Sequence, residues 1–219
     1  MRRPPGAHSL AVVKEQLTAS PPTLLRTVLR VAVIVCVAAA VLIVELTSSR
    51  GVSWRLITFT YQANLLAAAY YLWTLASPRA DARIGLRGAV VLYVVMAGVT
   101  WNLFLTEHSM GYTTANFLLH VAVPVLVIAD WLLVGRGATP TSWWYPVAWL
   151  AYPAAYLVLA LLVLNTAGRR APYYFLDPGS VGAPTVMLNV AMLAVCVLAA
   201  GYALLAVNRG ATVLRTDAA

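Results

Sequence analysis

Six long runs of apolar residues follow one another along the chain, and the short segments between them carry most of the charges. The runs show no alternation of apolar and polar positions, which favours helices over strands. Each run is long enough to cross about 30 Å of hydrocarbon, where only a helix satisfies its own backbone. We therefore expect six transmembrane helices, at about residues 24–46, 55–76, 88–106, 115–134, 144–165 and 184–207.

The composition agrees with a lipid environment. Hydrophobic residues make up 62% of the 219 residues and charged residues only 10%, whereas a soluble domain has about 25% charged residues. This excludes an ordinary soluble enzyme, and the high hydrophobicity also excludes a disordered chain. We predict an all-α integral membrane protein, a bundle of six transmembrane helices within residues 23–208. Residues 1–22 and 209–219 are expected to be cytoplasmic tails.

The basic residues indicate the orientation of the bundle. With the N-terminus inside, the 15 arginines and lysines divide into 11 in inner segments and 4 in outer segments, so both termini are expected in the cytoplasm. The net charge of +8 follows from this distribution and does not indicate a nucleic-acid partner. Many arginines but a single lysine point to a bacterial cytoplasmic membrane, with membrane lipids as partners. The oligomeric state stays open.

Polar side chains within the apolar runs gather in their outer half. Such side chains are costly in lipid and usually face a bundle interior or a wet cavity. This asymmetry predicts a pocket that opens only toward the outer leaflet. The outer half contains Glu45, Thr58, Thr60, Gln62, Asn102, Asn116, His120 and Asn189, with Asn64 nearer the middle.

The second run has polar residues on two faces. At about 100° per residue, Thr58 and Gln62 lie on one stripe, and Thr60 and Asn64 lie on another, roughly opposite. We expect protein to surround this helix. Thr60 and Asn64 are interpreted as residues that bond to neighbouring helices, at roughly 0.6 kcal/mol each.

The fourth run contains the only histidine expected inside the membrane. Asn116, His120 and Pro124 share one stripe, and because proline has no N–H, the carbonyl of residue 120 loses its helical partner. We expect the helix to bend there and to leave room for water or a ligand. Thr58 and His120 lie at nearly the same depth, so they are candidates for a nucleophile and its general base.

The remaining ionisable residues are interpreted separately. Asp130 lies about 15 Å deeper than His120, and we expect it to pair with Arg136 or with an arginine of residues 79–87. Glu45 and Glu107 lie at the outer rim, either in reach of His120 or solvated. The sequence has no cysteine or histidine spacing that is typical of a metal site, and we expect neither a metal nor a cofactor.

Three stretches resemble a known family. Residues 51–59, Gly-Val-Ser-Trp-Arg-Leu-Ile-Thr-Phe, resemble the entry of the second span in the androgen-induced gene family of six-span membrane threonine hydrolases. Residues 116–120, Asn-Phe-Leu-Leu-His, followed by Pro124, resemble its fourth-span Asn-x-x-x-His segment, and residues 172–177 are similar to an aromatic stretch before its last span. The likeness fits the prokaryotic branch, although Tyr61 replaces an acid of the animal members.

The resemblance implies hydrolysis of fatty acid esters of hydroxy fatty acids, or similar lipid esters, with Thr58 as the nucleophile and His120 as the second essential residue. Candidate donors to the oxyanion or to polar groups of the substrate are Gln62, Asn102 and Asn116. Candidate pocket or lid residues are Tyr173, Tyr174, Phe175 and Asn189. Two other functions remain open: a non-enzymatic protein that binds or moves a lipid or amphiphile in the same pocket, and a structural subunit.

Overall fold

The computed structural model describes residues 21–47, 55–107, 111–134, 141–164 and 173–216. Within these residues the chain forms helices and no strands. The first long helices are α2 (Pro21–Thr47), α4 (Phe59–Ala76) and α6 (Ile84–Thr100), the last of which continues as the π-helical turn η1 (Trp101–Leu105). The next long helix consists of α7 (Thr114–Phe117), the π-helical turn η2 (Leu118–Ala122) and α8 (Val123–Leu133).

The C-terminal part of the chain is more broken. The fifth helical segment consists of α9 (Tyr145–Trp149), α10 (Ala151–Val158) and η3 (Leu159–Leu164). The last helix, α12 (Ala183–Thr216), continues into the expected C-terminal tail. Three short helical elements complete the described fold: α5 (Pro78–Asp81), η4 (Tyr174–Leu176) and α11 (Pro178–Val181).

Helical segments lie at the positions of all six predicted runs, and four of them meet the length and apolarity of a membrane span. These four are Leu24–Thr47, Ile84–Leu105, Thr114–Leu133 and Ala183–Gly210. The fifth segment gives a shorter apolar helix, Tyr145–Leu161, and α4 is not among the four. The prediction of a membrane-embedded helical protein is therefore confirmed, whereas the crossing of all six segments stays a prediction.

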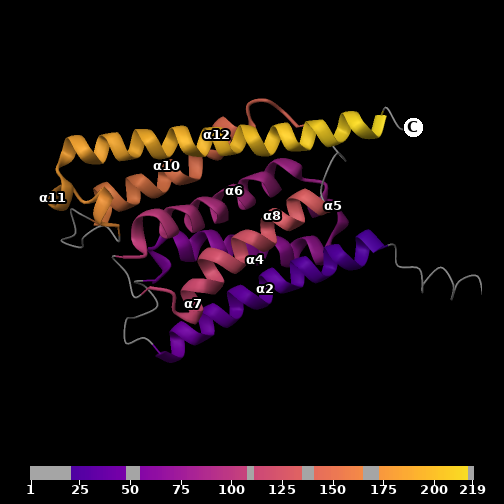
Figure 1. Cartoon of the computed structure of the whole chain (residues 1–219), viewed down its shortest axis with the longest axis horizontal. Coiled ribbons are helices and arrows are strands. Elements are labelled where there is room, and N and C mark those ends of the chain that lie inside the picture. Colours follow the sequence, from indigo (N-terminus) through magenta and orange to yellow (C-terminus); the bar gives the residue numbers. More distant parts are fainter. Residues whose placement is uncertain (1–20, 48–54, 108–110, 135–140, 165–172, 217–219) are drawn as a thin grey trace, which may run out of the picture.

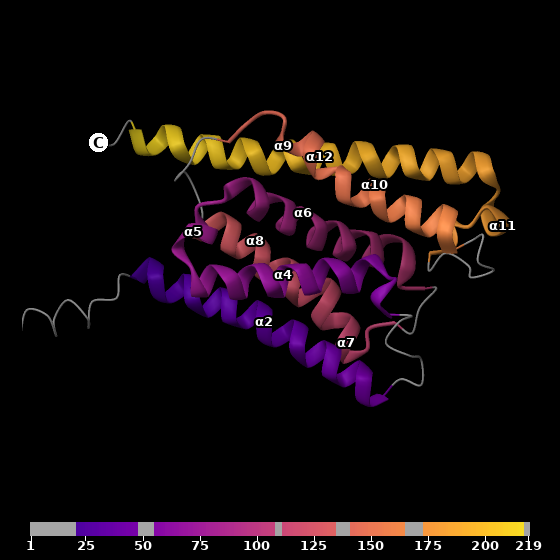
Figure 2. The same cartoon turned by 180° about the vertical axis from the view of Figure 1, so that it is seen from behind.

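Two clusters of buried apolar side chains fill the bundle. The first joins α2, α4, α6 and α8 and includes Val33 and Val127. The second joins α4, α6, α10 and α12 and includes Tyr156 and Val197. Because α4 and α6 contribute to both clusters, they form the middle layer, with α2 and α12 at opposite edges (Figures 1 and 2). The start of α2 and the end of α12 lie at the same end of the bundle (Figure 1).

The expectation that protein surrounds α4 holds only in part. The stripe with Thr60 and Asn64 is buried against the neighbouring helices, while Gln62 on the other stripe is half-buried. Further along that second stripe, Leu65 and Leu72 are exposed. One side of α4 therefore faces outward over its inner turns, which suits apolar side chains in contact with lipid.

A buried ion-pair cluster joins three helices near the end of the bundle where α2 begins and α12 ends. The Asp130 carboxylate accepts hydrogen bonds from Arg30 Nε at 3.2 Å and from Arg87 Nε at 3.1 Å, and Asp81 extends the cluster through Arg30. Asp130 is fully buried. The expected pairing of Asp130 with an arginine of residues 79–87 is confirmed through Arg87, and Arg136 lies outside the described residues.

Candidate functional site

His120 lies on η2, where both of its ring nitrogens have a partner. Nδ1 is 2.9 Å from the backbone carbonyl oxygen of Asn116, and Nε2 is 3.2 Å from the hydroxyl oxygen of Thr60 on α4. A carbonyl oxygen only accepts, so Nδ1 carries the ring proton and Nε2 is the acceptor of the Thr60 O–H. Thr60 and His120 are 9% and 6% exposed. The pair is thus a hydroxyl that donates to a neutral imidazole inside the bundle.

The hydroxyl that meets His120 is that of Thr60 and not that of Thr58. Thr58 is the N-cap of α4: its hydroxyl donates to the carbonyl of Arg55 at 2.8 Å and accepts the N–H of Tyr61 at 3.4 Å. A short hydroxyl side chain is well suited to this cap because it satisfies a backbone N–H that has no helical partner. The expected hydrogen bond between Thr58 and His120 is therefore not formed. Thr60, two residues further along the helix, forms the hydrogen bond to His120 instead.

Pro124 explains why the helix departs from α geometry beside His120. Since proline has no N–H, carbonyls one turn earlier lack a helical donor, and η2 is the turn affected. Side-chain amides replace the missing donors: Asn102 donates to the carbonyl of His120 at 3.1 Å, and Asn64 donates to that of Leu119 at 3.4 Å. The irregularity expected at His120 takes the form of a π-helical turn, and the carbonyl that was expected to be free accepts a hydrogen bond from Asn102.

Close packing holds the imidazole in place. The Trp101 ring stacks on the His120 ring, with centroids 4.5 Å apart and an interplanar angle of 17°. At Gly98, an added Cβ would lie 2.8 Å from Pro124 Cγ and 2.9 Å from the carbonyl oxygen of His120. Only glycine therefore allows α6 to approach the bent turn so closely, and this approach brings Trp101 onto the histidine.

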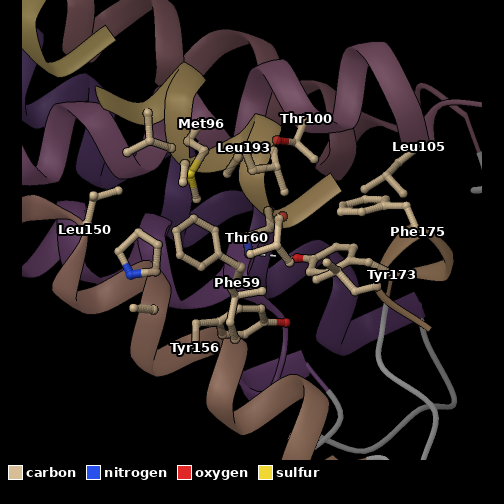
Figure 3. A pocket seen from close by; sticks show the side chains of 18 residues that line it. Phe59, Thr60, Met96, Thr100, Leu105, Leu150, Tyr156, Tyr173, Phe175 and Leu193 are labelled. Carbon is tan, nitrogen blue, oxygen red and sulfur yellow. Dashed lines mark hydrogen bonds between the residues drawn. The ribbon is translucent and has the colours of Figure 1, made fainter. Parts of the chain in front are cut away.

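A pocket of about 240 Å³ lies on the other side of Thr60. Thr60 is in its wall, together with Phe59 from α4, residues of α6 and η1, and residues of α10, η4 and α12. Figure 3 shows Thr60 between the side chains of Met96 and Leu150 on one side and those of Tyr173 and Phe175 on the other. None of the residues that line the pocket is charged. A nucleophile there would face hydrocarbon, with its base behind it.

The three side-chain amides that were expected to donate to a substrate all make hydrogen bonds within the protein. Gln62 donates to the carbonyl of Leu56 at 2.8 Å and accepts the Tyr152 hydroxyl at 2.6 Å. Asn102 donates to two backbone carbonyls, including that of His120, and Asn116 donates to the carbonyl of Gly111 at 2.8 Å. These amides position helices around the Thr60–His120 pair, and their donation to a substrate stays an untested prediction.

The aromatic segment before α12 does form part of the pocket. Tyr173 and Phe175 line it, whereas Tyr174 is exposed and is not among the lining residues. Asn189 on α12 donates to the carbonyl of Phe175 at 2.9 Å and so fixes the segment in place. The Tyr173 hydroxyl accepts the N–H of Thr60 at 3.4 Å, so it lies next to the Thr60–His120 pair.

No carboxylate among the described residues contacts His120. Glu45, whose role the sequence leaves open, pairs with Arg55, and Glu107 is exposed. The backbone carbonyl of Asn116 takes the position that an acid occupies in a Ser-His-Asp triad, where it orients the ring and fixes its tautomer. The described residues also contain no group of three His, Cys, Asp or Glu side chains that could hold a metal ion.

Comparisons with family models, with curated proteins and with solved structures give no match for this chain. The assignment of the site therefore depends on its own geometry. The interpretation of Thr60 and Asn64 as residues that bond to a neighbouring helix is confirmed by their hydrogen bonds to η2, whereas the sequence did not indicate that Thr60, and not Thr58, meets His120. The sequence feature that could have indicated this contact is the stripe that Thr60 and Asn64 share. In the structure this stripe faces the helix that contains His120.

Proposed function

We propose that this protein hydrolyses lipid esters within the membrane, with Thr60 as the nucleophile and His120 as the general base. The observation that carries the proposal is the hydrogen bond from the Thr60 hydroxyl to His120 Nε2, 3.2 Å long, at the wall of an uncharged apolar pocket. A hydroxyl with an adjacent base is the arrangement that activates a nucleophile. The resemblance to the androgen-induced gene family supports the activity, and the contact of Thr60 with His120 supports Thr60, and not Thr58, as the nucleophile.

The proposed reaction has two steps. Thr60 Oγ1 attacks the ester carbonyl carbon and gives its proton to His120 Nε2, and the resulting imidazolium returns that proton to the leaving alcohol when the C–O bond breaks. The product is an acyl-Thr60 intermediate. His120 then takes a proton from a water molecule as it attacks the acyl carbon, and the same proton restores the Thr60 hydroxyl when the fatty acid leaves.

The apolar pocket favours a lipid substrate in this proposal. Its wall consists of aliphatic and aromatic side chains apart from a few hydroxyls, so an acyl chain would be transferred there from a similar environment. Ala154 on its rim is exposed, which gives a path from the surrounding hydrocarbon. Fatty acid esters of hydroxy fatty acids, as the resemblance implies, are the substrates to test first.

Labelling with a fluorophosphonate probe in native membranes tests the proposal. We expect the wild-type chain to be labelled, Thr60→Ala and His120→Ala to lose labelling, and Thr58→Ala to keep it. Thr58→Ala is a matched control because it removes the same hydroxyl two residues away. Labelling lost in Thr58→Ala but retained in Thr60→Ala would return the nucleophile to Thr58. No labelling of the wild-type chain, combined with binding of the intact ester, would favour a protein that binds or moves a lipid.

A further inference from the structure

The first turn of α4 presents a backbone N–H to the pocket. The first N–H groups of a helix have no intrahelical acceptor and carry part of the positive end of its dipole. In α4 the side chain of Thr58 accepts the N–H of Tyr61, whereas the N–H of Thr60 reaches outward to the Tyr173 hydroxyl at 3.4 Å. The N–H of Thr60, the proposed nucleophile, is therefore directed at the pocket. Its hydrogen bond to Tyr173 is long, so a ligand oxygen could replace the phenol as its acceptor.

Three hydroxyl groups meet at this point, and they are not equivalent. The Tyr173 phenol lies beside the side chains of Thr60 and Tyr156. Thr60 donates its proton to His120, and Tyr156 donates to the carbonyl of Ile57 at 3.1 Å. The Tyr173 oxygen accepts the Thr60 N–H, and the neighbouring Thr60 and Tyr156 hydroxyls direct their protons to His120 and Ile57. The Tyr173 O–H can therefore turn from these neighbouring oxygens to a ligand in the pocket.

The position of Tyr173 is well defined by its neighbours. Its ring stacks on that of Phe175, with centroids 5.7 Å apart and an interplanar angle of 19°, and it packs against Tyr156 at 6.2 Å. Phe175 is in turn bound to α12 through Asn189. A donor that is fixed before the substrate arrives needs no reorganisation during the reaction, and this is what makes an oxyanion hole effective.

We propose that the Tyr173 O–H and the Thr60 N–H form an oxyanion hole for a neutral carbonyl compound. This inference rests on the proposed hydrolase activity for its catalytic consequence. When Thr60 Oγ1 attacks, the carbonyl oxygen becomes an alkoxide beside the same residue, where both donors can reach it. Both donors are uncharged, and the lining residues include no arginine or lysine. The site therefore selects uncharged esters over the carboxylates of free fatty acids, because a carboxylate would be buried there without a counter-charge.

Ester turnover by the full-length protein in detergent tests the catalytic role. Tyr173→Phe is expected to lower kcat about 10²-fold, the usual effect of losing one oxyanion donor, with little change in KM. Tyr93→Phe is the control: it removes the same group from a tyrosine outside the pocket wall, whose hydroxyl donates to the carbonyl of Trp149 at 2.9 Å, so kcat should change far less. An unchanged kcat in Tyr173→Phe, or a rise in KM alone, would overturn the assignment.

A spectroscopic measurement tests the donor even without turnover. A long-chain methyl ketone with an isotope-labelled carbonyl is bound to the Thr60→Ala protein, which retains the backbone N–H and cannot form an adduct through the threonine. We expect the carbonyl stretching frequency to be lowered by the two donors and to move back toward its value in hydrocarbon in Thr60→Ala/Tyr173→Phe. Identical frequencies in both proteins would refute the oxyanion hole and leave hydrolysis intact. A shift in a protein without ester turnover would support the donor and refute the hydrolase.

Discussion

At the start of α4, two threonines two positions apart have different roles. Successive residues of a helix differ by about 100°, so Thr58 and Thr60 point in nearly opposite directions although their depths differ by only about 3 Å. The sequence predicts the depth of both and the presence of His120 at a similar level. It does not predict which face meets the histidine, because that depends on the helix that packs there. Thr58 caps α4, while Thr60 reaches His120.

The two roles predict opposite effects of removing each hydroxyl on ester turnover, while both variants lose some stability. Thr58→Ala removes the N-cap of α4 and should lower the free energy of unfolding by about 1 kcal/mol, with ester turnover largely retained. Thr60→Ala leaves the buried Nε2 of His120 without its donor, which should cost about 1–3 kcal/mol, and it should abolish turnover. Unfolding in mixed micelles and an ester assay on the same preparations measure both. Equal losses of turnover in the two variants would contradict this division of roles.

At the scale of elements, the hydrophobic pattern predicts where helices occur but not how they are distorted. The six expected runs coincide with helical segments, and Pro124 correctly marks the irregular turn beside His120. The break at Leu150 between α9 and α10 and the π-helical turn η1 were not expected. Such distortions result from contacts between helices, as between Gly98 and Pro124. They cannot be predicted from the hydrophobic pattern, because a run of apolar residues does not specify which helix packs against it.

Gly98→Ala is expected to disturb the site although it changes neither Thr60 nor His120. The new Cβ would lie 2.8 Å from Pro124 Cγ and 2.9 Å from the carbonyl oxygen of His120, so α6 must move away from η2. We expect a loss of about 1–3 kcal/mol in stability, as for other overpacked cores, and about 10²-fold in turnover because His120 is displaced from Thr60. Gly210→Ala is the control, since its added Cβ meets nothing within 4 Å. Wild-type turnover in Gly98→Ala would show that the close approach is not required.

At the scale of the whole molecule, a buried charged cluster and an uncharged pocket lie toward opposite ends of the bundle. The end where α2 begins and α12 ends contains the cluster around Asp130, and the opposite end contains the pocket with Thr60, with the ion pair of Glu45 and Arg55 outside the pocket wall. The sequence predicts a pocket in the outer half, and the position of this pocket at one end of the bundle agrees with that pattern. The sequence does not predict which residues of α10 and α12 line the pocket. An apolar side chain that faces the pocket cannot be distinguished in the sequence from one that faces lipid.

The charged cluster is predicted to stabilise the packing of α2, α6 and α8. Asp130→Asn removes the shared carboxylate, so that the buried Arg87 loses its ion-pair partner and Arg30 keeps only Asp81. Breaking such a buried pair typically costs about 3–5 kcal/mol. Asp81→Asn should cost much less, since the Asp81 side chain is 20% exposed and Arg30 keeps its bond to Asp130. Unfolding in mixed micelles compares the two variants, and a cost for Asp130→Asn no larger than for Asp81→Asn would show that the cluster contributes little.

The orientation of the bundle predicts which residues can be labelled from outside the cell. Arg79 precedes α6 and Glu107 follows η1, so they lie at opposite ends of a helix of 22 residues, about 33 Å long. If the termini are cytoplasmic, as the basic residues predict, the pocket end faces outward, and the proposed hydrolase would take lipid esters from the outer leaflet. In a protein with Cys36 and Cys196 replaced by alanine, Glu107→Cys should react with a membrane-impermeant maleimide in intact bacterial cells. Arg79→Cys should react only after permeabilisation. The reverse pattern would place the pocket on the cytoplasmic side, and labelling of both in intact cells would contradict the crossing of α6.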